Sequence, residues 1–233
     1  MKQSKKFTLS YPELSQRGDR VQTVVKRDAS EFVKYGYIET ISDTVREKTE
    51  QFKNILPDMF WEGQKTLTTN AKDQYRGKLV EILGEITFKA KLALGANSKE
   101  YATFRFSGLD RKSDSQLVLY SKHVCKTAEF FKEPLATRNL TEDIINQAIA
   151  ETKALDSAID AQAEAIAVRE QKSVERLKQG NELYDLILEL CEVGKRIWEN
   201  ENEAFYHDYV LYGSSKSSSK TENQEPVITE TEE

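Results

Sequence analysis

The feature that most constrains this chain is a long stretch that contains almost no helix-breaking residue. Between Thr141 and Tyr212 there is no proline, and glycine occurs only at Gly180 and Gly194. Side chains of one seam recur there at alternating steps of three and four residues, as in a supercoiled helix. The seam comprises Ile145, Ala148, Thr152, Leu155, Ile159, Gln162, Ile166, Arg169 and Ser173. The seam continues from Leu177 after a shift of one residue, and we therefore expect one long helix with a kink near Gly180-Asn181.

The beginning of the chain carries a clear signal for the start of a helix. Ser10 can cap the first turn, and Glu13 stands three residues later, where its side chain can reach back to the cap. Apolar side chains then recur at helical spacing as far as Leu56, with a break predicted at Gly36. Pro57 ends this segment, because proline cannot continue a helix that precedes it.

A second long helix is predicted over 58–94. Gly95 follows it, at the position where a left-handed C-terminal cap favours glycine. Residues 96–113 lack helical periodicity and form an irregular excursion. Part of this segment alternates as a strand does, which leaves a hairpin as the alternative. We prefer a further helix near 114–132, with Ser113 as its cap.

Composition agrees with a helical chain of 233 residues. It contains only 10 Gly and 4 Pro, whereas an all-β chain needs many turns and more of both. We expect an all-α fold, an elongated antiparallel helical bundle of about four long helices with the excursion near 96–113. The bundle domain is predicted to span 10–212. A flexible N-terminus (1–9) precedes it, and a disordered Ser/Glu-rich tail (213–233) follows it.

The sequence offers no complete set of residues for catalysis, metal binding or nucleotide binding. His123, His207, Cys125 and Cys191 are the only histidines and cysteines. His123 and Cys125 point about 200° apart on a helix, which is unsuitable for chelation. No Glu-x-x-His pair, phosphate-binding loop or nucleophile elbow occurs. We therefore predict no catalytic, cofactor-binding or metal residues, and a protein that is not an enzyme.

Four glycines are candidates for close helix packing. Gly77 and Gly84 are seven residues apart on the second long helix, and Gly180 and Gly194 are two heptads apart on the last one. Glycine is unfavourable inside a helix, so glycines that share a register suggest that another helix approaches closely. We predict such a neighbour at the face of Gly77 and Gly84. The alternative is that these are incidental glycines in tolerant helices.

Aromatic residues gather where the last helix is predicted to end, and aromatic residues are enriched at protein interfaces. This candidate partner patch comprises Trp198, Phe205, Tyr206, Tyr209 and Tyr212. The alternative is that the same side chains pack on the end of the bundle.

The function predicted from this architecture is a non-catalytic structural or protein-interaction bundle, such as a scaffold, an adaptor or an assembly subunit. Its partner would be another protein or a second copy of the chain. One alternative is a membrane-active bundle, although the sequence has no long apolar run. Another is association with nucleic acid through the basic N-terminal helix, where residues 1–27 hold seven Lys/Arg against two acids. The net charge of −5 disfavours general nucleic-acid binding. No apolar export segment follows the first residues, so we expect a cytoplasmic protein.

Overall fold

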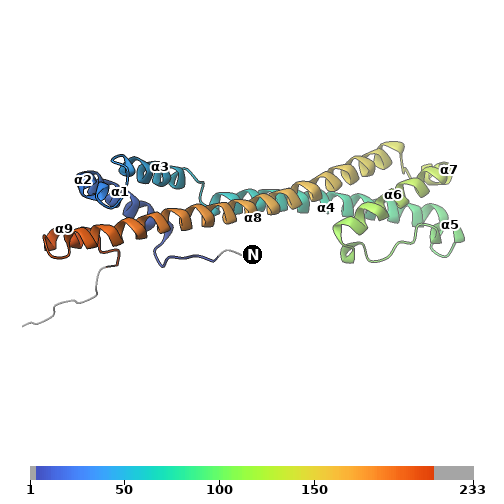
Figure 1. Ribbon diagram of the computed structural model, residues 1–233. Helices are drawn as coiled ribbons and strands as arrows, with labels where there is room; N and C mark the ends of the chain where they lie inside the picture. The colour runs from blue at the N-terminus through green and yellow to red at the C-terminus, as the bar shows by residue number, and fades with distance from the viewer. Residues whose placement is uncertain (1–3, 213–233) are drawn as a thin grey trace, which may run out of the picture. The chain divides into compact units, whose positions relative to one another are not determined.

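The computed structural model describes residues 4–212, and within this range the chain is all-α with no strand (Figure 1). The all-α prediction is therefore confirmed. The tail predicted over 213–233 and residues 1–3 lie outside the described range. The helices in chain order are α1 Tyr11–Arg27, α2 Ala29–Val33, α3 Ile41–Lys53, α4 Asp58–Leu94, α5 Lys99–Ala102, a 3₁₀ turn η1 Leu109–Arg111, α6 Asp114–Phe130, α7 Lys132–Ala136, α8 Glu142–Trp198 and α9 Glu203–Asp208.

Local capping chemistry fixes several helix starts. The Ser10 backbone N–H donates to the Glu13 carboxylate at 2.6 Å, and Glu13 N–H donates to the Ser10 hydroxyl at 3.4 Å. Ser113 and Gln116 form the same reciprocal pair at the start of α6. The helical interpretation is therefore confirmed there and the hairpin alternative is wrong, because 114–130 is helical and the described residues contain no strand.

The described residues form two compact units. The first unit comprises 51–180 with residues 4–5, and the second comprises 6–50 and 181–212. The border inside α8 falls at Gly180-Asn181, where the sequence predicts a kink. The helix is nevertheless assigned without a break across this border, over 57 residues.

The core of the first unit lies between the second half of α4, the helices α6 and α7, and the first turns of α8 (Figure 1). Its buried residues include Leu79, Leu83, Ile86, Phe104, Leu117, Val124, Leu135, Ala148 and Leu155. One polar pair is buried within it. The hydroxyls of Ser121 and Thr152 are 2.6 Å apart, and the Thr152 hydroxyl also donates to the Ala148 carbonyl. This pair joins α6 to α8 without leaving a buried hydroxyl unsatisfied.

Replacing Ser121 by alanine is expected to lower the free energy of unfolding of the first unit by about 1 kcal/mol, because Thr152 loses its partner on α6. Adding Thr152→Val should recover part of that loss, since both members of the pair are then apolar. Urea unfolding of the two variants measures both effects. Thr127→Ala, which removes a half-buried hydroxyl that bonds to the His123 carbonyl of the same helix, is the control. Equal stability of the Ser121 and Thr127 variants would contradict the expectation.

The second unit has its own core, formed by α1, α2, α3 and the last turns of α8. Phe7 belongs to this core, with a ring 5.9 Å from that of Tyr11 and 5.5 Å from that of Tyr184. Phe7 lies inside the segment 1–9 that the sequence predicts to be flexible, and it is buried against the second unit. This is a long-range contact, which local composition does not reveal.

The last helix also ends earlier than predicted. The sequence suggests helix as far as Tyr212, but α8 ends at Trp198 and a separate short helix, α9, follows. Asn202 accepts a hydrogen bond from the Phe205 N–H at 3.1 Å and caps α9. Asparagine competes for backbone hydrogen bonds and so favours a new helix start over continuation.

Candidate functional site

One face of α4 is open to solvent along most of the helix. The outer α4 face, as we call it, consists of Phe60, Gly63, Leu67, Asn70, Gln74, Gly77, Glu81, Gly84, Phe88 and Lys91, which follow each other at steps of three and four residues. Phe60 is 42% exposed, and Leu67 and Phe88 are each 62% exposed. Three large apolar side chains of one helix face are thus in solvent, and covering them with another molecule would remove apolar surface from water.

The opposite face of α4 lies along α8 within the first unit. Gln162 donates to the Thr69 hydroxyl, and Arg169 donates to Glu62, each at 2.8 Å. The residue number rises on one helix as it falls on the other, so the two helices are antiparallel. No residue of α4 before Leu79 is buried. Polar contacts at Glu62 and Thr69 join this part of α4 to α8, and Tyr75 packs against the hydrophobic core.

The glycines differ sharply in their surroundings. A Cβ atom added at Gly63, Gly77 or Gly84 would meet no heavy atom within 4 Å. The close helix neighbour predicted at Gly77 and Gly84 is therefore not found within the described chain. Each glycine inside a helix costs about 1 kcal/mol relative to alanine, so three of them on one open face cost about 3 kcal/mol that no contact within this chain explains.

Gly194 does make a close contact, although not with another helix axis. A Cβ atom there would lie 2.3 Å from the ring of Tyr209. Glycine at this position therefore makes room for an aromatic ring. Gly180, the fourth candidate, is buried in α8 at the border between the two units.

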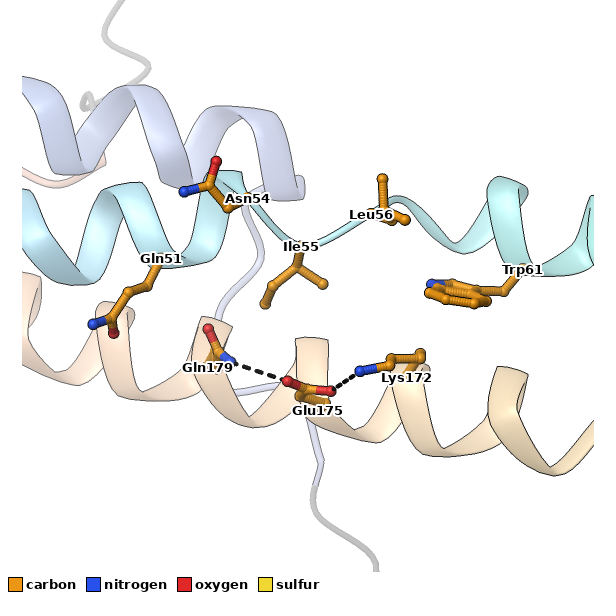
Figure 2. A pocket seen from close by; sticks show the side chains of 8 residues that line it. All are labelled: Gln51, Asn54, Ile55, Leu56, Trp61, Lys172, Glu175 and Gln179. Carbon is orange, nitrogen blue, oxygen red and sulfur yellow. Dashed lines mark hydrogen bonds and ion pairs between the residues drawn. The ribbon is translucent and has the colours of Figure 1, made fainter.

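A groove of about 490 Å³ lies in the first unit, between the α3–α4 connection and α8 (Figure 2). Lys172 donates to Glu175 at 2.8 Å, so these two charges compensate each other. The indole N–H of Trp61 is buried without a hydrogen-bond partner. The groove contains no nucleophile beside a base. It is lined by Gln51, Asn54, Ile55, Leu56, Trp61, Lys172, Glu175 and Gln179.

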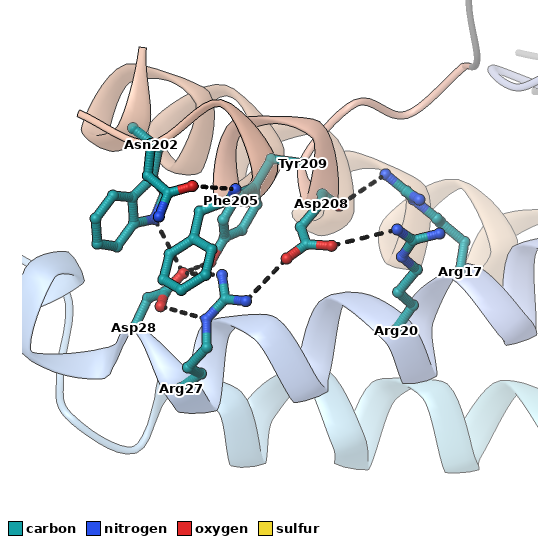
Figure 3. A network of polar contacts seen from close by, with 9 residues as sticks. Arg17, Arg20, Arg27, Asp28, Asn202, Phe205, Asp208 and Tyr209 are labelled. Atoms are coloured by element: carbon teal, nitrogen blue, oxygen red, sulfur yellow. Dashed lines mark hydrogen bonds and ion pairs between the residues drawn. The ribbon is translucent and has the colours of Figure 1, made fainter. Parts of the chain in front are cut away.

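A polar network closes the end of the second unit around Asp28 (Figure 3). Asp28 is only 3% exposed. Its carboxylate accepts two hydrogen bonds from Arg27, at 2.7 and 2.8 Å. It also accepts one from the Trp198 indole at 3.0 Å and one from the Tyr209 hydroxyl at 2.7 Å. The network thereby connects the α1–α2 junction to the end of α8 and to the residue after α9.

The same network determines the protonation of Asp28. Burial opposes its ionisation, but hydrogen bonds from Arg27, Tyr209 and Trp198 outweigh burial and hold the pKa of the carboxyl below its ordinary value of 3.8. Burial, assisted by the hydrogen bond to Asp28, raises the pKa of the Tyr209 hydroxyl. Asp28 is therefore ionised and Tyr209 neutral near pH 7. Arg27, Trp198 and Tyr209 all donate hydrogen bonds to Asp28, so we interpret the network as one that stabilises the second unit.

The predicted aromatic patch is divided by this packing. Tyr209 is fully buried and belongs to the core, so it is not part of an exposed surface. Trp198, Phe205 and Tyr206 are half-buried, and the Arg27 guanidinium lies over the Phe205 ring at 3.7 Å. Only Tyr212 is largely exposed among the five.

The basic N-terminal helix uses several of its charges internally. Arg17 donates to the Val210 carbonyl at 2.6 Å. Arg20 and Arg27 both pair with Asp208, at 3.3 and 2.8 Å. These contacts reduce the positive charge that α1 could offer to a phosphate backbone.

The cysteines have the properties of structural residues. Burial raises the pKa of both the Cys125 and the Cys191 thiols. His123 lies near the surface, with Nε2 3.0 Å from the Thr103 carbonyl oxygen. In the part of the chain that the structure covers, no group of three or more His, Cys, Asp or Glu side chains is arranged to hold a metal ion. Within 4–212, no helix combines the length and the apolar character needed to cross a membrane.

Comparison with known proteins finds no matching family model, no matching curated protein and no matching solved structure. The outer α4 face is the candidate functional site that the geometry favours. The sequence identified Gly77 and Gly84 but missed the apolar side chains beside them. Phe60 and Leu67 are seven residues apart and Phe88 follows 21 residues later, and these multiples of seven were the available signal.

Proposed function

We propose that this chain is a non-catalytic protein-interaction module, a scaffold or assembly subunit that contacts its partner through the outer α4 face. The observation that carries the proposal is the exposure of Phe60, Leu67 and Phe88 along a single helix face. Burying such side chains on association contributes roughly 25 cal/mol for each Å² removed from water.

Two further observations support this proposal. The open glycines of α4 have a cost in helix stability that contacts within the chain do not offset. The charged groups of the groove, Lys172 and Glu175, pair with each other, and the polar groups of the Asp28 network bond to one another, which disfavours a catalytic role for either. The same proposal places the module in the cytoplasm, and the free thiols of Cys125 and Cys191 are compatible with a reducing compartment.

Site-specific photo-crosslinking tests this function. A benzophenone amino acid at Leu67 or at Phe88 should yield covalent products of higher mass when cells that produce the protein are irradiated. The same group at Ala163, an exposed position on α8, is the matched control and should yield far less. If the α4 positions yield no more product than Ala163, the outer α4 face contacts nothing and the proposal fails.

A further inference from the structure

The outer α4 face consists of two rows of residues, one of larger side chains and one in which three of the five members are glycines. Its large members are Phe60, Leu67, Gln74, Glu81 and Phe88, spaced by seven residues. Its other members are Gly63, Asn70, Gly77, Gly84 and Lys91, also spaced by seven. In an antiparallel helix pair, each position of the first row lies opposite a position of the second row on the other helix. The face therefore suits contact with an antiparallel copy of itself.

We propose that a second copy of this chain packs its α4 antiparallel against the outer α4 face, about a two-fold axis between Gln74 and Gly77. Leu67 then lies opposite Gly84 of the second copy, and Phe88 lies opposite Gly63. Large side chains enter the spaces that the glycines leave open, as in a well-packed core. Because the axis is two-fold, every such contact occurs twice. This inference rests on the proposed function and names its partner.

The polar members of the face are complementary in the same register. Glu81 lies opposite Asn70 of the second copy, so the amide can donate to the carboxylate. Phe60 lies opposite Lys91, whose ammonium can lie over the aromatic ring. The register brings no two like charges opposite each other within the face. An antiparallel second copy therefore brings no charge repulsion into the face, and each charged member has a polar or aromatic side chain opposite it.

The length of the face agrees with a stable dimer. From Phe60 to Lys91 it extends roughly 47 Å along the helix, at about 1.5 Å per residue. With flanking positions, roughly 20 residues of each copy take part, which is the lower end of a standard protein interface. The side of α4 that lies along α8 follows the same seven-residue repeat through Trp61, Thr68, Tyr75 and Ile82. A shared repeat keeps the outer face directed away from α8 over its whole length.

Sedimentation equilibrium of the full chain with Gly84→Leu tests the packing. The wild type should dimerise, and the variant should dimerise roughly 100-fold more weakly, because leucine fills the space for Leu67 of the second copy. Its melting temperature when dilute should not fall, since nothing lies within 4 Å of that position in the chain. Ala163→Leu, which adds a leucine to an exposed position of α8, is the control and should dimerise as the wild type does.

Disulfide trapping tests the antiparallel register. A mixture of Leu67→Cys and Gly84→Cys chains should form a mixed disulfide on mild oxidation, because the two Cβ atoms face each other closely. Leu67→Cys alone should remain mostly reduced, whereas a parallel dimer would crosslink it. The native Cys125 and Cys191 are buried and do not compete. A wild type that is monomeric at every concentration would overturn the dimer. If the wild type is monomeric but Leu67 crosslinks to a different protein, the dimer proposal fails and the proposed function is still supported.

Discussion

Replacing Asp28 by alanine is expected to destabilise the second unit by about 3 kcal/mol. The substitution leaves the Trp198 indole N–H and the Tyr209 hydroxyl without their acceptor, and an unsatisfied buried donor costs about 1–3 kcal/mol. It also removes the carboxylate partner of Arg27, although Asp208 continues to pair with that guanidinium. Urea unfolding followed by tryptophan fluorescence measures the loss.

Two variants make this measurement decisive. Asp28→Asn keeps an acceptor oxygen, so its loss should be smaller than that of Asp28→Ala. Asp43→Ala removes an exposed acid of α3 that pairs with Arg46 and should change stability little. If Asp28→Ala were as stable as Asp43→Ala, the network would have no structural role.

The same carboxylate predicts an acid-dependent loss of stability. The pKa of Asp28 in the folded protein lies below its ordinary value of 3.8. A lowered pKa contributes stability above the unfolded value, and this contribution is lost as the pH falls through the folded value. The wild type should therefore lose its higher free energy of unfolding, relative to Asp28→Asn, as the pH falls below about 4. An advantage that is independent of pH down to pH 2 would contradict this assignment.

Gly194→Ala is expected to destabilise the second unit by about 2 kcal/mol, although alanine normally favours a helix. The new Cβ atom would lie 2.3 Å from the Tyr209 ring. The Tyr209 hydroxyl donates a hydrogen bond to Asp28, which restrains the ring. The ring must therefore shift, and overpacking of this kind costs about 1–3 kcal/mol. Thermal unfolding detects the change.

Gly77→Ala is the matched control, with an effect of opposite sign. Nothing in the chain lies within 4 Å of the added Cβ atom. In dilute solution, where the chain is monomeric, this substitution should therefore raise stability by about 1 kcal/mol through helix propensity alone. If both variants changed stability in the same direction, the contact between Gly194 and Tyr209 would not be as described.

Local signals in the sequence predicted the helices well. The bounds of α4 match the predicted 58–94, because Pro57 stops the preceding segment and Gly95 supplies a cap with φ of 86°. The starts of α1 and α6 were predicted from Ser10 and Ser113 for the same reason. Each of these features depends on residues within one turn of one another, so the sequence contains the necessary information.

Features that depend on distant contacts were not predicted. Asp28 gave no sign that it would meet Trp198 and Tyr209, because these residues are far away in the sequence. The end of α8 was misplaced, since aromatic periodicity continued into α9 and outweighed the weaker capping signal of Asn202. The spacing of Gly77 and Gly84 predicted a close helix neighbour, but a Cβ atom added at either position meets nothing within 4 Å in the described chain.

The mass of the protein as isolated from the cells that naturally produce it tests the central claim most directly. Light scattering after gentle chromatography should give the wild type at least twice the mass of one chain. Leu67→Glu/Phe88→Glu, which alters only side chains already 62% exposed, should remain folded and have the mass of one chain. A wild type and a double variant with the same mass would contradict the claim that the outer α4 face is where this protein meets another molecule.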